Sequence, residues 1–110
     1  MGAWGKAPWD NDGAADWFDD VMKKSGLPLL VEEALKLDVK DHHEDVRAAA
    51  YVLAALGRVY IWPVDKLDAH LKLAIDQLRE IAAMQIYSEA GFTPVIEQEI
   101  ADLQSRLNRK

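Results

Sequence analysis

Residues 48–56 read AAAYVLAAL, a stretch that is apolar on nearly every side once it is wound into a helix. A helix of this kind is usually buried, and its small alanine side chains let neighbouring helices approach closely. The helix is predicted to begin near His42, because Asp41 and Glu44 have the spacing of a capping box. Gly57 is a natural residue to end it. We therefore expect this stretch to lie in the central helix of the domain.

Helical periodicity continues on both sides of this stretch. Apolar residues recur at intervals of three and four, and Gly or Pro residues mark the boundaries. Residues 58–63 (RVYIWP) have the composition of a strand, but no second stretch is available to pair with them, so we interpret them as a linker with Trp62 buried. The other predicted helices span residues 13–24, 28–37, 66–88 and 94–108. The expected fold class is all-α, with about five helices in an orthogonal or bundle-like packing and an irregular, tryptophan-containing N-terminal arm.

The last predicted helix has a regular apolar stripe, which suits antiparallel packing against residues 66–88. The stripe consists of Ile96, Ile100, Leu103 and Leu107. The only basic cluster, Arg106, Arg109 and Lys110, follows at the end of this helix. We interpret these cations as complements to the negative end of the helix dipole rather than as a nucleic-acid site.

Length, charge and cysteine content narrow the possible functions. The chain has 110 residues, half of them hydrophobic, which suits one domain over residues 1–110 with its own core. It has no cysteine, which excludes disulfides, thiol catalysis and cysteine zinc sites. The net charge of −6 argues against nucleic-acid binding. No signal peptide or membrane-spanning run is evident, so we expect a cytoplasmic protein without a membrane partner.

The candidate binding residues lie in the N-terminal arm and the first predicted helix. Tryptophans in the arm can either pack back onto the domain or form a recognition surface. Asp12 is expected to cap the helix. The oxygen atoms around it can either fix this turn or coordinate a hard cation. The predicted binding residues are Trp4, Trp9, Asp10, Asn11, Asp12, Asp16 and Trp17.

An acidic face runs along the same predicted helix. Asp12, Asp16, Asp19 and Asp20 lie on its outer part, and Lys23 and Lys24 partly compensate for them. This face is either a solvated surface with acids at the positive end of the helix dipole or a docking surface for a basic partner.

Three histidines are the remaining candidates for metal chemistry. His42 and His43 are adjacent, so their imidazoles point about 100° apart on a helix and cannot easily share one metal ion. His70 lies alone in the helix predicted over residues 66–88. No phosphate-binding loop, nucleophile elbow or Glu-x-x-His motif occurs. We therefore assign no catalytic residue, no metal ligand and no cofactor.

The opening of the chain resembles a bacterial family catalogued as domain of unknown function 4259. The resemblance rests on Gly2, Trp4 and Gly5, on Trp9 followed by Asp-Asn-Asp, on the pair Asp16 and Trp17, and on the later stretch RAAAYVLAALGR. It covers about the first two thirds of the chain. The resemblance implies a small helical bacterial protein and brings no known activity.

Small size, negative charge and the absence of catalytic motifs favour a non-enzymatic protein-interaction module, immunity-like or adaptor-like, with a basic protein partner. One alternative is a small metal-dependent hydrolase or metal-binding domain that uses the Asp10/Asp12 or the His42/His43 region. Another is a self-associating structural subunit. The sequence leaves the oligomeric state open.

Overall fold

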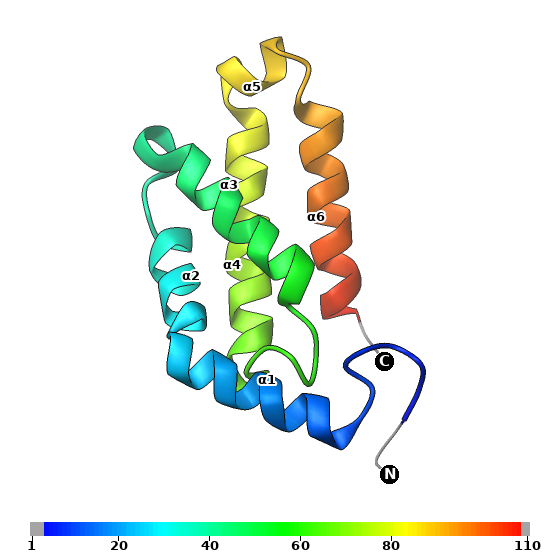
Figure 1. Cartoon of the computed structure of the whole chain (residues 1–110). Coiled ribbons are helices and arrows are strands. Elements are labelled where there is room, and N and C mark those ends of the chain that lie inside the picture. The colour runs from blue at the N-terminus through cyan, green and yellow to red at the C-terminus, as the bar shows by residue number, and fades with distance from the viewer. Residues whose placement is uncertain (1–3, 109–110) are drawn as a thin grey trace.

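The computed structural model describes residues 4–108, and within this range the chain consists of helices and their connections (Figure 1). The helices are α1 (Asp12–Ser25), α2 (Leu27–Leu35), α3 (Val39–Leu56), α4 (Val64–Ala83), α5 (Gln85–Glu89) and α6 (Thr93–Leu107). The predicted all-α class is confirmed, with six helices in the described range where about five were expected. Each of the six is too short or too polar to span a lipid bilayer.

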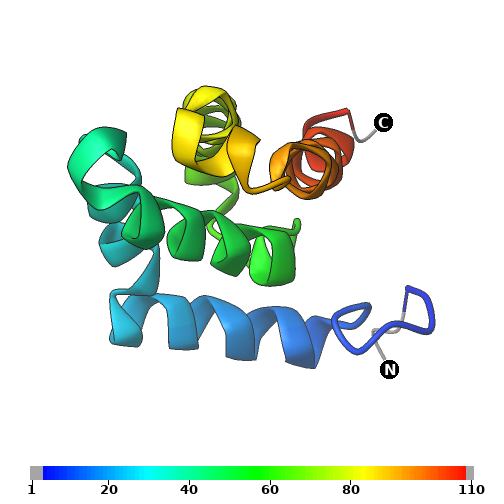
Figure 2. The ribbon, with the colours of Figure 1, turned by 90° about the horizontal axis from the view of Figure 1, so that it is seen from above.

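Two packing modes combine in this fold. α4 and α6 lie side by side and antiparallel, as the apolar stripe of the last predicted helix indicates (Figure 1). α3 crosses them obliquely, and α2 packs against α3 and α4. α1 runs across one end of this group and lies roughly perpendicular to α4 (Figure 1 and Figure 2). The fold is thus bundle-like at α4 and α6 and orthogonal at α1.

The central helix is α4, and the prediction that α3 would be central is wrong. α4 contacts α2, α3, α5 and α6, and Leu67, Leu71, Ala74 and Leu78 on it are fully buried. α3 leaves one side open, where Tyr51 is 72% exposed. The reason is the size of the side chains. Burial stabilises in proportion to apolar area, so the leucines and isoleucines of α4 gain more from the centre than the alanines of α3.

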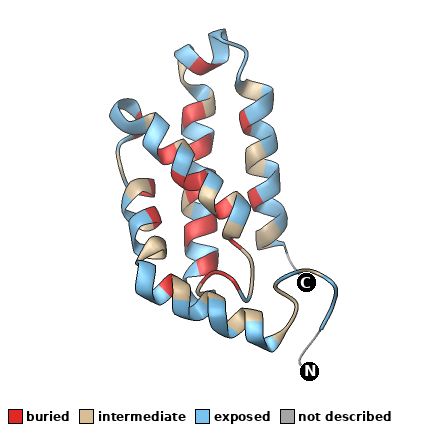
Figure 3. Ribbon diagram, in the orientation of Figure 1, coloured by how far each residue is buried: buried red, intermediate tan, exposed pale blue. Residues whose placement is uncertain are grey.

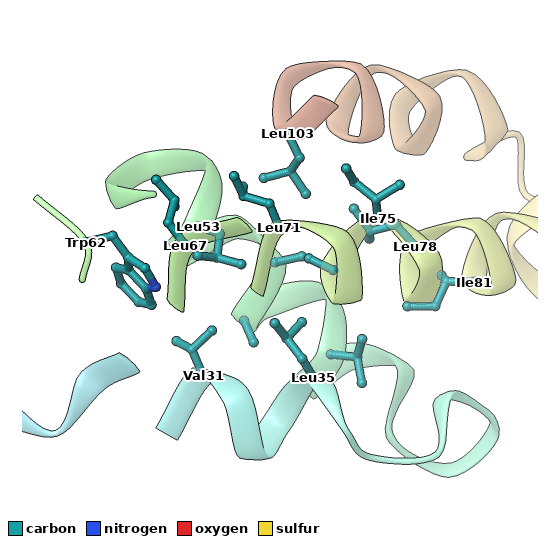
Figure 4. Close-up of a cluster of buried hydrophobic side chains, with 14 of the residues drawn as sticks. Val31, Leu35, Leu53, Trp62, Leu67, Leu71, Ile75, Leu78, Ile81 and Leu103 are labelled. Atoms are coloured by element: carbon teal, nitrogen blue, oxygen red, sulfur yellow. The ribbon is translucent and has the colours of Figure 1, made fainter. Parts of the chain in front are cut away.

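The core forms where α2, α3, α4 and α6 meet (Figure 3). Leu35, Leu53, Leu71 and Leu103 converge on it from these four helices (Figure 4). Trp62, from the loop between α3 and α4, closes one end of the core and is only 2% exposed. The predicted burial of this tryptophan in a linker is therefore confirmed.

The helix predicted over residues 66–88 is interrupted. Met84 has an extended backbone (φ −68°, ψ 135°), so α4 ends at Ala83 and α5 follows as a separate short helix. The break turns the chain so that Tyr87 is buried against the core. Gly91, in the left-handed region (φ 81°), then helps the chain reverse into α6. The apolar pattern continues through Met84, so periodicity could not show the break.

Two helices begin one residue earlier than predicted, and the predicted N-cap of the first is displaced. Asn11, rather than Asp12, caps α1, because its Oδ1 accepts a hydrogen bond from the Ala14 N–H at 2.8 Å. Asp12 is already the first helical residue, where its charge favours the positive end of the helix. Asn and Asp serve almost equally as N-caps, so an Asp-Asn-Asp run does not decide the position. Likewise, the helix predicted over residues 94–108 begins at Thr93, and Phe92 is its N-cap.

The start of α3 differs in the same way. Asp38, rather than Asp41, caps this helix by accepting a hydrogen bond from the Lys40 N–H at 2.9 Å. The predicted start near His42 coincides with a kink, since His42 has non-helical angles (φ −134°, ψ 29°) within α3. The additional first turn buries Val39 against the core, a gain that the local capping pattern does not reveal.

Two long polar side chains join helix ends to neighbouring helices. Gln77 on α4 donates its Nε2 hydrogen atoms to the carbonyl oxygens of Leu35 and Leu37 at 2.8 and 3.0 Å. Arg106 on α6 donates to the carbonyl oxygen of Ala54 at 2.8 Å. The last carbonyl groups of a helix lack partners within it, so these contacts satisfy the ends of α2 and α3. Arg106 lies in the last turn of α6, as expected, and it also satisfies the end of α3. Arg109 and Lys110 lie outside the described residues.

Candidate functional site

The N-terminal arm folds back on itself as a compact turn before α1. The Trp4 N–H donates to the Asp10 carbonyl at 2.6 Å, and the Asp10 N–H donates to the Ala7 carbonyl at 3.0 Å. The Asp10 carboxylate accepts from the Ala7 N–H at 3.1 Å. Asp10 and Asn11 therefore act in turn and cap formation, the structural one of the two roles expected for them.

The two arm tryptophans contact the loop between α3 and α4. The rings of Trp4 and Tyr60 lie 4.5 Å apart between centroids. Both side chains stay about half exposed, Trp4 at 48% and Tyr60 at 55%. Trp9 is half-buried, and the Arg58 guanidinium lies 4.7 Å from its ring centroid, within the range of a cation–π interaction. The arm is thus held to the loop by its rings, with one aromatic pair facing solvent.

Tyr60 also has an unusual backbone. Its φ angle is 74°, and it is the only non-glycine residue with positive φ in the described part of the chain. A side chain in this region costs about 1 kcal/mol or more. Such strain persists only where surrounding contacts hold it, and it is concentrated at functional sites.

Beside Tyr60, a hollow of about 380 Å³ separates α1 from the loop. Asp16 and Asp19 line the α1 side, and Tyr60 and Val64 line the other. Met22 and Trp62, which are both buried, also line it. We call the group Trp4, Asp16, Asp19, Tyr60 and Val64 the acidic-aromatic surface.

Lysines on the same helix neutralise part of the acidic face of α1. Lys23 donates to Asp19 at 2.9 Å, and this hydrogen bond raises the pKa of Lys23. Lys24 lies 3.0 Å from Asp20. Asp16 forms no ion pair within residues 4–108, and neither does Asp12. The uncompensated negative charge of α1 therefore lies at its N-terminal half, next to the arm.

The predicted binding residues divide into two groups. Trp4 and Asp16 belong to the acidic-aromatic surface. Trp9 holds the arm to the loop through its contact with Arg58. Trp17 is exposed and packs edge-on against Phe18, with ring centroids 5.2 Å apart, but it does not line the hollow. Tyr60 and Val64 were not among the predicted binding residues, because nothing local in the sequence shows that Tyr60 contacts the arm or that Val64 lies across the hollow from α1.

The residues considered for a metal site lie apart. Within residues 4–108, no three histidine, aspartate or glutamate side chains come together in a way that could hold a metal ion. His42 lies 3.8 Å from the Asp45 carboxylate on the same helix, and the Nδ1 atom of His43 lies 2.7 Å from the Tyr87 hydroxyl. The described residues thus do not assemble the donor set that the metal-binding alternative requires.

A buried hydrogen-bonded network was also missed from the sequence. His70, which is 2% exposed, lies 3.0 Å from the Trp62 indole nitrogen through Nδ1 and 2.9 Å from Glu32 through Nε2. The hydrogen bond with His70, followed by the charge of Lys36, lowers the pKa of Glu32. The sequence does contain a sign that His70 is buried. His70 is three residues after Leu67 and four before Ala74, so it lies on the apolar stripe of α4.

A family model described as "Domain of unknown function (DUF4259)" matches residues 2–86. The chain belongs to this family. The DUF4259 match includes the arm, α1, the acidic-aromatic surface and the Glu32–His70–Trp62 network, and it ends before α6. Gly2, which contributed to the resemblance, lies outside the described residues. No curated protein and no solved structure matches the chain.

Proposed function

We propose that this DUF4259 protein is a non-enzymatic, adaptor-like or immunity-like binding module that uses its acidic-aromatic surface to hold a basic segment of another cytoplasmic protein. One observation carries the proposal. The rings of Trp4 and Tyr60 form a half-exposed pair, and the backbone of Tyr60 is strained. Asp16, which has no ion-pair partner within residues 4–108, lines the same hollow as Tyr60.

The aromatic part of the surface suits an interface. Tryptophan and tyrosine are enriched among the residues that contribute most to binding energy, because they bury large areas with few rotatable bonds. The hollow beside Tyr60, with Met22 and Trp62 in its lining, offers a place for one apolar side chain of the partner. The arm and the loop already contact each other, so little ordering would accompany binding.

The charge of the surface favours a basic partner. Asp12 and Asp16 carry negative charge without a lysine partner within residues 4–108, and the chain as a whole carries −6. Complementary charge increases the association rate and suppresses acidic partners, nucleic acids included. We therefore expect lysine or arginine residues around the apolar side chain that enters the hollow.

Affinity capture and calorimetry test this proposal together. Capture from a lysate of the native host identifies the bound protein, and titration calorimetry with that purified partner measures its affinity. We expect Trp4→Ala and Tyr60→Ala each to weaken binding about tenfold or more, the loss typical of an important interface residue. Asp16→Asn should mainly slow association and reduce its salt dependence.

The matched control is Val95→Ala, an exposed apolar residue on α6 that lies away from the arm. This variant should bind like the wild type. If Trp4→Ala and Tyr60→Ala also bind the purified partner like the wild type, the acidic-aromatic surface is not the binding site.

A further inference from the structure

We infer that the chain has a second, separate docking site: the groove between α3 and α6, which fits a basic amphipathic helix of a partner protein. α3 and α6 both pack along α4 but make few contacts with each other. The space that they leave is an open groove of about 650 Å³, lined by residues of α3, α4, α5, α6 and the turn before α6. We call it the α3–α6 groove.

The lining of this groove combines small side chains on one wall with a buried apolar base. Ala48 and Ala54 form much of the α3 wall, and such small side chains allow a helix to approach closely. Leu78 and Leu103, both fully buried, form the apolar base. Tyr51 and Phe92 also line the groove. Tyr51 is largely exposed, and Phe92 is less exposed than Tyr51. The apolar side of α3 that lacks a partner in this fold is therefore one wall of the groove.

The charge of the groove selects the occupant. Arg47 forms a bidentate ion pair with Glu99, at 3.0 and 2.5 Å, and its guanidinium also lies 5.5 Å from the Phe92 ring centroid. The hydrogen bonds from Arg47 to Glu99 raise the pKa of Arg47. Within this ion pair the two opposite charges offset each other. Glu44 on α3 and Asp102 on α6 remain as two acids among the lining residues. An occupant with an apolar row flanked by lysine or arginine matches this arrangement.

The same charges disfavour a second copy of this chain as the occupant. A symmetric contact between two grooves would bring together two linings that each carry three acids and one arginine, so two surfaces of net negative charge would face each other. An asymmetric contact would require a basic apolar helix. The exposed helix at the far end of the molecule, α1, has four aspartates within Asp12–Asp20. A different protein with a basic helix is therefore the occupant that the groove favours.

This inference does not depend on the proposed function. The α3–α6 groove shares no lining residue with the hollow beside Tyr60, and its α6 wall lies beyond the region matched by the family model. Variants in the arm therefore test the proposed function, and variants in the groove test this inference independently.

The test uses synthetic helical peptides as probes. One peptide of about 15 residues, matching the length of α6, has leucine on one face and lysine on the other; a second has glutamate in place of lysine. Titration calorimetry and amide chemical-shift mapping of the full chain measure affinity and location. We expect the lysine peptide to bind one-to-one with shifts confined to the groove, and the glutamate peptide not to bind.

Two matched variants separate a specific site from general attraction between charges. Ala48→Arg fills the groove, whereas Ala55→Arg adds the same side chain to an exposed position of α3 outside it. Ala48→Arg should weaken the lysine peptide about tenfold or more, and Ala55→Arg and Trp4→Ala should leave its affinity near that of the wild type.

Three results would overturn the inference. The first is that the lysine peptide leaves the groove amides of the wild type unshifted. The second is that Ala48→Arg and Ala55→Arg reduce the affinity for this peptide equally. The third is a dimer in analytical ultracentrifugation that Ala48→Arg abolishes and Ala55→Arg retains, which would assign the groove to a second copy.

Discussion

The indole nitrogen of Trp62 donates a hydrogen bond to Nδ1 of His70 at 3.0 Å. An indole N–H can only donate, so Nδ1 must be the unprotonated nitrogen of the imidazole. The ring proton then lies on Nε2, which donates to Glu32 at 2.9 Å. This chain of two hydrogen bonds joins the loop before α4 to α4 and α2, and it explains why a histidine can lie in the core at this position.

Removing the indole donor should destabilise the fold through His70. Trp62→Phe leaves the buried Nδ1 atom of His70 without a partner, which costs about 1–3 kcal/mol in addition to the lost volume. Urea unfolding of Trp62→Phe, His70→Leu and the double variant measures the coupling between the two residues. The double variant should lose less stability than the sum of the single losses; strict additivity would contradict the hydrogen bond.

Glu32 should make the stability of the fold sensitive to acid. Its folded-state pKa lies below the usual value of 4.5, chiefly because of the hydrogen bond with His70, so the unfolded state binds the proton more readily. The stabilisation is complete above the unfolded-state pKa and is lost as the pH falls through the lower folded-state pKa. Glu32→Gln should reduce the fall in unfolding free energy below about pH 4.5, measured by urea unfolding across pH. An unchanged pH profile would show that Glu32 does not contribute.

Gly57 should not tolerate a methyl group. A Cβ atom there would lie 2.5 Å from the carbonyl oxygen of Leu53, to which the Gly57 N–H already donates at 2.7 Å. Gly57→Ala must therefore shift the backbone at the end of α3, at a cost of about 1–3 kcal/mol. In the control Gly13→Ala, the nearest such atom is Asn11 Oδ1 at 3.5 Å, so stability should stay equal or rise by up to about 1 kcal/mol. Thermal unfolding followed by circular dichroism compares the two, and equal melting temperatures would contradict the clash.

The strain at Tyr60 can be measured separately from its ring. Tyr60→Ala and Tyr60→Gly both remove the contact with Trp4, but only glycine accepts φ 74° without steric cost. Tyr60→Gly should therefore be more stable than Tyr60→Ala by up to about 1 kcal/mol in urea unfolding. If the alanine variant is as stable as the glycine variant, the loop relaxes and the backbone of Tyr60 is not strained in solution.

Three of the five residues of the acidic-aromatic surface, Trp4, Asp16 and Asp19, could be predicted from the sequence. Trp4 and Asp16 stand out because one is a large apolar group in a broken segment and the other is an acid without a lysine four residues later. Tyr60 and Val64 could not be found in this way. The contact of Tyr60 with Trp4 and the place of Val64 across the hollow from α1 depend on how the chain returns after α3. Trp4 and Tyr60 are more than 50 positions apart in the sequence.

The sequence by itself determined the all-α class, the approximate helix positions, the packing stripe of α6 and the burial of Trp62. These features follow from interactions over a few residues: helical periodicity, proline and glycine at the boundaries, and the large apolar area of an indole. Only the tertiary structure decided that α4 and not α3 is central, that the chain breaks at Met84, that His70 joins Trp62 to Glu32, and that one side of α3 stays open. The physical reason is that helices compete for a limited core, and large aliphatic side chains outweigh alanines there however apolar the alanine helix is.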